Sequence, residues 1–144
     1  MLLTRPPLPP QLSGILLPPD PTTVAPPVDP TVATDLASAT QFLYTGSNPI
    51  QTGVAPDTIE PRRVAVLRGK VQDRDGTALP GVKINVLGHP ELGRTLTRAD
   101  GAFDLAVNGG GQLTLRYEKN GFLAAQRAIV APWRDYAWLP EVVM

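Results

Sequence analysis

The sequence has no cysteine, a single histidine, few aromatic residues and no long apolar run. Without cysteine, the chain can form neither a disulfide framework nor a thiolate metal site. No stretch approaches the roughly 18 consecutive apolar residues of a membrane-spanning helix. Residues 1–7 lack the basic region and the long apolar region of a signal peptide, so none is predicted there. The sequence therefore does not indicate a cellular compartment.

Net charge is also lacking, because 13 Lys and Arg balance 13 Asp and Glu. The two halves differ, however. Residues 1–61 carry one Arg and five acidic residues, a net charge of −4, and residues 62–144 carry 12 basic and eight acidic residues, a net charge of +4. The basic half has no stripe of Lys and Arg interleaved with aromatic residues, so nucleic-acid binding is not predicted.

Proline is plentiful but unevenly placed, with ten of the 17 prolines in residues 1–30. Proline favours extended polyproline II, so we predict a mostly disordered Pro-rich linker over residues 1–41. An ordered strap over residues 42–61 and a β-sandwich over residues 62–144 are predicted to follow. The Pro-rich string at residues 5–10 is compatible with an aromatic groove of a partner, but a spacer is the simpler interpretation.

A short helix is predicted where the linker ends. Residues 35–44 can form one or two helical turns, with Asp35 as the N-cap. The strap beyond it contains two glycines and an Asn48-Pro49 turn signal. A sandwich of about 80 residues buries only about 60–65% of its unfolded surface, so it needs support from neighbouring segments or chains. We therefore expect the strap to lie on the sandwich or on a neighbour.

Glycine turns at nearly even spacing dominate the second half of the chain. Asp-Gly and Asn-Gly pairs favour tight hairpins, because Gly and Asn tolerate the positive φ that such turns need. Between the turns, apolar residues alternate with polar ones, which is typical of strands with one buried face. Strands are predicted at residues 64–72, 82–87, 94–98, 102–107, 113–117 and 123–131, with a seventh beginning at 138. The sequence therefore predicts a small all-β sandwich.

Two phrases in this region resemble the carboxypeptidase regulatory-like family. They are GKVQDRDGTALPGVKI at residues 69–84 and TRADGAFDL at residues 97–105, followed by Gly121-Phe122. The resemblance spans residues 64–131 and implies a seven-stranded Greek-key β-sandwich of the transthyretin (prealbumin) type. Its structural turns would be formed by Asp75, Gly76, Gly81, Asp100, Gly101 and Gly121.

A narrower resemblance spans residues 42–144. The strings FLYTGSNPIQTGV, NVLGHPE, AVNGGG, LRYEKNGF and PWRDYAWLP are similar to the module ahead of the repeat shell in bacterial RHS/YD-repeat proteins, which are akin to teneurins. Those proteins are very large, often exported and polymorphic-toxin-like. This chain has no YD repeats and no toxin domain. The resemblance therefore implies the opening module of such a protein.

No catalytic, cofactor or metal site is predicted. Asp73-x-Asp75-Gly76 resembles the start of a calcium loop, but Thr77 and Ile84 occupy positions 5 and 12, where the loop needs oxygen ligands and a Glu. His89 stands alone and precedes Pro90, which excludes the two-His helical zinc motif. No serine lies in a Gly-x-Ser-x-Gly elbow.

Aromatic residues gather at the C-terminal end, where Trp133, Tyr136 and Trp138 fall within six residues. Such side chains either pack the rim of a small core or anchor an interface. With Phe42 and Tyr44 they form the predicted docking surface of a non-enzymatic structural module, whose partners are neighbouring domains of a larger protein. Two alternatives stay open: an adhesin or carbohydrate-binding module that uses the same aromatics with Arg134 and Asp135, and an enzyme with chemistry at His89.

Overall fold

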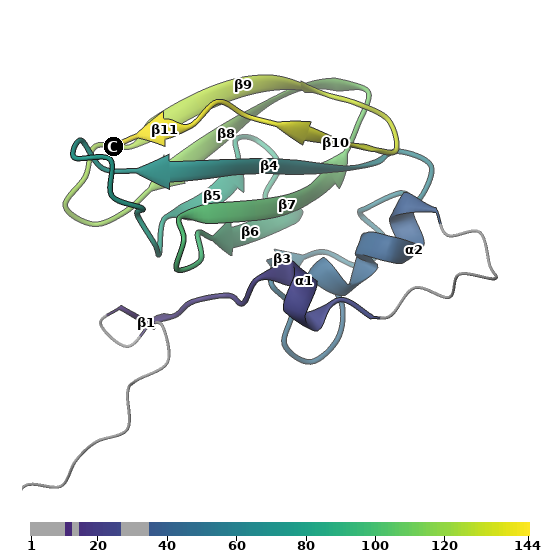
Figure 1. The fold of residues 1–144 in the computed structure, drawn as a ribbon. Coiled ribbons are helices and arrows are strands. Elements are labelled where there is room, and N and C mark those ends of the chain that lie inside the picture. Colours follow the sequence, from purple (N-terminus) through teal and green to yellow (C-terminus); the bar gives the residue numbers. More distant parts are fainter. Residues whose placement is uncertain (1–10, 13–14, 27–34) are drawn as a thin grey trace, which may run out of the picture.

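The computed structural model describes residues 11–12, 15–26 and 35–144, and the strands from residue 52 onward form a sandwich of two β-sheets (Figure 1). In the smaller sheet, β4 (Val64–Gln72) pairs antiparallel with β7 (Ala102–Asn108) on one side. On its other side β4 pairs in parallel with β10 (Asp135–Trp138) and then β11 (Val142–Val143). The C-terminal segment therefore forms one edge of this sheet.

The larger sheet has five strands in the order β3–β6–β5–β8–β9. All four of its strand pairs are antiparallel. Its strands are β3 (Thr52–Val54), β5 (Lys83–Val86), β6 (Leu92–Leu96), β8 (Gly111–Glu118) and β9 (Ala125–Ala131). The first six predicted strands are confirmed to within two residues at each end, and so is the all-β sandwich.

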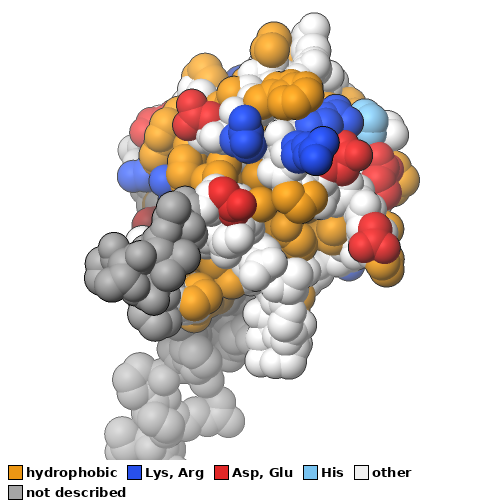
Figure 2. Space-filling view, turned by 90° about the vertical axis from the view of Figure 1, so that its right-hand side faces the viewer, with side chains coloured by type: hydrophobic (Ala, Val, Ile, Leu, Met, Phe, Trp, Pro, Cys, Tyr) orange, Lys and Arg blue, Asp and Glu red, His pale blue; other side chains and the backbone are white. Residues whose placement is uncertain are grey.

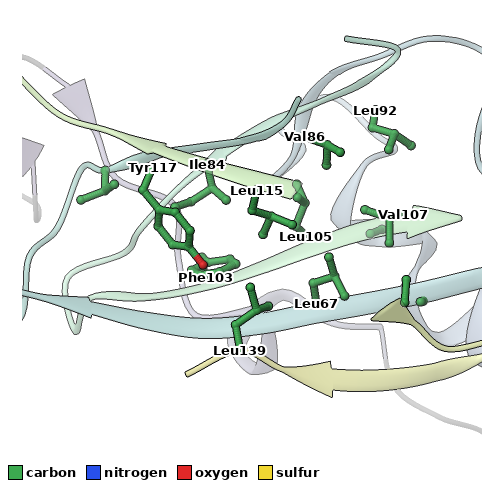
Figure 3. Close-up of a cluster of buried hydrophobic side chains, with 14 of the residues drawn as sticks. Leu67, Ile84, Val86, Leu92, Phe103, Leu105, Val107, Leu115, Tyr117 and Leu139 are labelled. Atoms are coloured by element: carbon green, nitrogen blue, oxygen red, sulfur yellow. The ribbon is translucent and has the colours of Figure 1, made fainter. Parts of the chain in front are cut away.

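The core lies between the sheets and consists of the inward residues of the alternating patterns (Figure 3). Tyr117 and Phe103 are its largest fully or almost fully buried side chains, and their rings meet edge-to-face with centroids 5.8 Å apart. Such aromatic pairs stabilise a core beyond their buried area. The buried residues of these alternating patterns include Leu67, Val71, Val82, Ile84, Val86, Phe103, Leu105, Val107, Leu115 and Tyr117.

The C-terminal strand differs from the prediction. A single strand beginning at 138 was expected, but β10 begins at Asp135 and ends at Trp138, and β11 follows as a separate pair of residues. Pro140 lies in the gap, and proline has no N–H to donate to a ladder. Leu139 N still donates to Arg68 O, so both pieces follow β4.

The outer face of the β4–β7 sheet is also partly covered, around Val66, which the alternating pattern did not predict. The helical segment α2 (Leu36–Thr40) and η1 (Gln41–Leu43) packs there, with Asp35 capping α2 by accepting from Ser38 N at 2.7 Å. Leu43 and Ile50 enclose Val66, an outward residue of β4. The predicted helix and its cap are therefore present, and the strap lies on the sandwich.

Gln51 fixes the strap to both sheets. Its side chain is fully buried, and its Nε2 donates to Leu92 O in β6 at 2.7 Å and to Ala106 O in β7 at 2.9 Å. Its Oε1 accepts from Ala106 N at 2.7 Å. The amide thus satisfies both backbone groups of a β7 residue as a neighbouring strand would. In Figure 1 the strap, α2 and β3 lie below the sandwich, at the side of β6 and β7.

Part of the Pro-rich segment is described. It contains β1 (Gln11–Leu12), β2 (Ile15–Leu16) and α1 (Pro21–Val24). Leu17 and Pro21 are buried, and Leu17 lines a groove with strap residues and Arg94. The Pro-rich string at residues 5–10 lies outside the described residues, so the division into linker, strap and sandwich stays a prediction. No helix in the described ranges is long and apolar enough to cross a membrane.

Replacing Gln51 with Ala is expected to destabilise the protein by about 3 kcal/mol, because the change leaves buried backbone groups of two strands without partners. The free energy of unfolding in urea measures the effect. Gln112→Ala is the matched control, because Gln112 is exposed at the start of β8. Losses of equal size in the two variants would contradict the bridging role of Gln51.

Tyr117→Phe is expected to leave stability at neutral pH unchanged or slightly higher, because the buried hydroxyl has no hydrogen-bond partner among the described residues. Burial raises the pKa of Tyr117 to about 12, above the value of about 10 for an unfolded chain. The wild type should therefore lose roughly 2–3 kcal/mol as the pH rises from about 10 to about 12, since the unfolded chain ionises first.

Urea unfolding across this pH range tests the tyrosine prediction. The Tyr117→Phe variant should lose less stability than the wild type as the pH rises from about 10 to about 12. A pH profile of Tyr117→Phe identical to that of the wild type would refute the assignment.

Candidate docking surface

Three of the predicted docking residues are exposed. Trp133, Tyr136 and Trp138 keep 59%, 41% and 65% of their surface in contact with solvent. Tyr136 and Trp138 are two residues apart in β10 and so share one face of the sheet. The parallel register places them beside Val66 and Arg68 of β4, on the outer face. These two rings therefore lie on the surface and do not contribute to the core.

Arg68 lies against both rings. Its guanidinium carbon is 4.6 Å from the ring centre of Tyr136 and 5.6 Å from that of Trp138. A cation at such distances is attracted to the negative ring faces. We call Arg68, Tyr136 and Trp138 the β10 patch. Together they form an aromatic surface with a positive charge in it.

A buried carboxylate holds the guanidinium in place. Asp104 of β7 lies directly opposite Arg68 in the antiparallel register and is only 2% exposed. Its Oδ1 accepts from Arg68 Nε, and its Oδ2 accepts from Arg98 Nη1 at 2.9 Å. A buried carboxylate is stable when it is paired and hydrogen-bonded in this way. A polar row therefore runs across the sheet from β10 to Arg98.

Trp133 occupies a different place, at the end of the sandwich where β4 begins. Its indole lies on Gly110, and a Cβ at this glycine would clash with the ring. Pro61, Arg62 and Arg63 line a groove with Trp133. Figure 2 looks onto this end and shows apolar side chains next to Lys and Arg. Trp133 is therefore separate from the β10 patch in its contacts.

The strap aromatics face the protein's own sandwich. Phe42 and Tyr44 are half-buried and pack against the cluster of Leu43, Ile50 and Val66. Burial raises the pKa of Tyr44. Their packing accounts for them without a partner, so the proposals below do not rely on these two residues.

Exposed apolar side chains concentrate in the last strands and the connections between them. Of the nine large hydrophobic residues that are exposed in the described part of the chain, seven lie between residues 122 and 143. They are Phe122, Leu123, Val130, Trp133, Tyr136, Trp138 and Val143. Figure 1 shows β9 and the β10–β11 segment along the same side of the sandwich, opposite the strap. We call this the open side.

The predicted glycine turns connect strands of the sandwich. Gly76, Gly81, Gly101 and Gly121 all have positive φ, between 76° and 88°. Asp73 closes the first turn, because its Oδ1 accepts from Asp75 N and Thr77 N, whereas the Asp75 side chain is exposed. In the second turn, Asp100 Oδ1 accepts from Ala102 N.

The described residues contain no group of three His, Cys, Asp or Glu side chains that could hold a metal. His89 is exposed, and its Nδ1 lies 2.8 Å from Glu91 Oε1. This contact lowers the pKa of Glu91. A pair of exposed side chains in a turn does not form a catalytic constellation.

Fold and surface together define a transthyretin-like β-sandwich module with one apolar, aromatic side. The chain belongs to the teneurin TTR-like domain family, whose profile matches residues 59–144. Teneurin-1 of Gallus gallus is 40% identical over 95 residues, which are 65% of this chain and 4% of that protein. Teneurin-m of Drosophila melanogaster is 41% identical over 88 residues, 61% of this chain and 3% of that protein. These findings confirm the transthyretin-like sandwich and the teneurin resemblance.

The chain thus spans only about 3–4% of the length of the curated relatives it matches. Among solved structures, a chlorocatechol 1,2-dioxygenase from Pseudomonas putida is 11% identical, with a TM-score of 0.48 over 64% of each chain. A likeness at that distance carries no argument about function.

Sequence reasoning missed Arg68 and Asp104. Both occupy outward positions in alternating strands, where a charged residue normally faces solvent. The sequence offered one indication that these two charged residues are paired. Each lies inside a strand that is otherwise rich in apolar residues. Only the pairing of β4 with β7 brings the two charges together.

Asp104→Asn is expected to destabilise the protein by about 2 kcal/mol, because two guanidinium groups lose their shared carboxylate. The loss of stability should be smaller than for a fully buried ion pair, because the Arg68 side chain is partly exposed and water screens its charge. Urea unfolding measures the loss, with Asp75→Asn, at an exposed turn residue, as the control. Equal stability of the two variants would show that the polar row does not hold the sheet.

Proposed function

We propose that this chain is a non-enzymatic structural and docking module, the opening module of a large RHS/YD-repeat protein akin to teneurins. In this proposal the open side packs against a neighbouring domain of that protein. The observation that supports it best is that seven of the nine exposed large hydrophobic residues in the described part of the chain lie on β9, on β10–β11 and in the connections next to these strands. Clustered exposed apolar groups mark interaction sites, whereas singly scattered ones do not.

The composition of the β10 patch favours a protein partner. Trp, Tyr and Arg are the residues that most often supply the energy of protein interfaces. Asp104 and the two rings already order Arg68, so binding would cost little side-chain entropy. Within the described residues, Arg68 bonds Asp104 through Nε alone, so its terminal N–H groups can donate to backbone carbonyls or carboxylates of a partner.

The family supports a role within a larger protein. The curated relatives are more than twenty times longer than their matched regions, so in them this domain has many neighbours. A sandwich of about 80 residues is also small for independent stability. The strap supports one side, and a neighbouring domain on the open side would support the other.

Carbohydrate binding is the second candidate, because Tyr136 and Trp138 are exposed rings on one strand. A sugar stacks on a free ring face, however, and the guanidinium of Arg68 already lies over both rings. A sugar would have to displace Arg68 or use the opposite ring faces. Arg134 and Asp135 are exposed beside the patch and would be available to hydroxyl groups.

Oxidative footprinting tests the docking proposal, with the 144-residue chain compared with a longer natural protein that contains it. Tyr136 and Trp138 should be modified several-fold less in the longer protein, because a neighbouring domain covers them. Leu87, which is exposed outside the open side, serves as the internal control and should react alike in both.

Equal modification of Tyr136 and Trp138 in both proteins would overturn docking to a neighbouring domain. Glycan-array binding by the 144-residue chain that disappears in Trp138→Ala would instead favour the carbohydrate alternative. Trp138→Ala itself should lower stability little, since the ring is 65% exposed.

A further inference from the structure

The chain has four asparagines, Asn48, Asn85, Asn108 and Asn120, and two of them precede glycine. An asparagine is chemically labile when the backbone nitrogen of the next residue can reach its side-chain carbonyl carbon. We infer that Asn120 is a site of spontaneous modification, at which the folded protein converts an amide to aspartate and isoaspartate.

The reaction needs only water. The backbone nitrogen of Gly121 gives up its proton to solvent and attacks Cγ of Asn120. A C–N bond forms, the bond from Cγ to the side-chain nitrogen breaks, and ammonia leaves with a proton from water. Water then opens the resulting succinimide ring at either carbonyl, which gives aspartate or isoaspartate. No oxidant or reductant takes part.

The turn between β8 and β9 presents these atoms to solvent. Asn120 and Gly121 are both exposed, and a Cβ added at Gly121 would meet nothing within 4 Å. Phe122 N donates to Lys119 O across the turn at 3.1 Å, and Lys119 Nζ donates to Pro80 O at 2.9 Å. Within the described ranges, neither the Asn120 amide nor the Gly121 N–H has a hydrogen-bond partner.

Asn108 has the same Asn-Gly sequence but is locked. Its Oδ1 accepts from Glu60 N and its Nδ2 donates to Thr58 O, each at 2.8 Å. The attacking group is also occupied, because Gly109 N donates to Arg63 O at 2.5 Å. Rotation of the amide toward the backbone nitrogen would break all three hydrogen bonds.

The other two asparagines are blocked for different reasons. Asn48 precedes Pro49, which has no N–H to lose. Asn85 lies within β5 and precedes the β-branched, buried Val86, so the ladder and the side chain both oppose attack. Asn120 is therefore the one asparagine of the four that the fold leaves reactive.

The product would alter the rim of the open side. Gly121 and Phe122 of this turn line a groove with Asp73, Arg74 and Asp75, so a new carboxylate at Asn120 would arise next to a groove that already holds two acidic side chains and one basic side chain. The isoaspartyl product also adds a methylene to the backbone of a tight turn. The conversion thus changes both charge and shape beside two exposed apolar residues, Phe122 and Leu123.

Peptide mapping by mass spectrometry tests the inference on the full chain, aged at physiological temperature and mildly alkaline pH. Trypsin places Asn108 and Asn120 in separate peptides, residues 99–116 and 120–127, so each conversion is read independently. A sample digested at the start of the incubation corrects for conversion during digestion. In the native protein, Asn120 should convert about tenfold or more faster than Asn108, as expected if restraint adds at least about 1.4 kcal/mol to the barrier.

The same experiment in concentrated urea provides the matched control, because unfolding removes the hydrogen bonds of Asn108. Both Asn-Gly pairs should then convert at similar rates. Equal rates in the native protein, or an Asn120 that stays intact, would overturn the inference. If Asn120 still converted faster than Asn108 by the same factor in urea, the folded structure would not be the cause of the difference in rate, and the inference would be wrong.

Discussion

The buried amide of Gln51 is the contact on which the asymmetry of this sandwich depends. A single side chain bonds Leu92 in one sheet and Ala106 in the other, and it satisfies both backbone groups of Ala106. Because it ties the strap to both sheets, it also fixes β3 beside β6 and Leu43 over Val66. One side of the sandwich is closed as a result.

The remaining edges show how uneven this protection is. Open strand edges invite pairing with other chains, and proteins normally guard them. At β10, Asp135 Oδ1 accepts from Tyr136 N, and Pro140 interrupts the edge. At the free edge of β9, only one backbone group in the described structure has a side-chain partner. This group is Gln126 O, which accepts from Arg127 Nη1. The least guarded strand therefore lies on the side that also exposes the aromatics, which is where the docking proposal places a partner.

Sequence reasoning found the sandwich because its signal is local. The turns and the alternation fix the strands and their inward faces, such as Phe103 and Tyr117. It missed β3, because three residues with a central glycine have no strand signal until β6 lies beside them. It also missed the roles of Gln51 and Asp104. A polar residue between apolar neighbours normally faces solvent. Gln51 and Asp104 are buried because they bond residues that are 36 to 55 positions away in the sequence.

Amide hydrogen exchange on the 144-residue chain tests the division into a closed side and an open side most directly. In β9, Ala131 O faces β8, so Ala128 and Val130 direct their N–H groups outward in the antiparallel ladder. Their amides should exchange rapidly, whereas Ala106 N–H, which also points away from its own sheet, should exchange only when the domain unfolds. Exchange of Ala106 as fast as that of Ala128 would contradict the account.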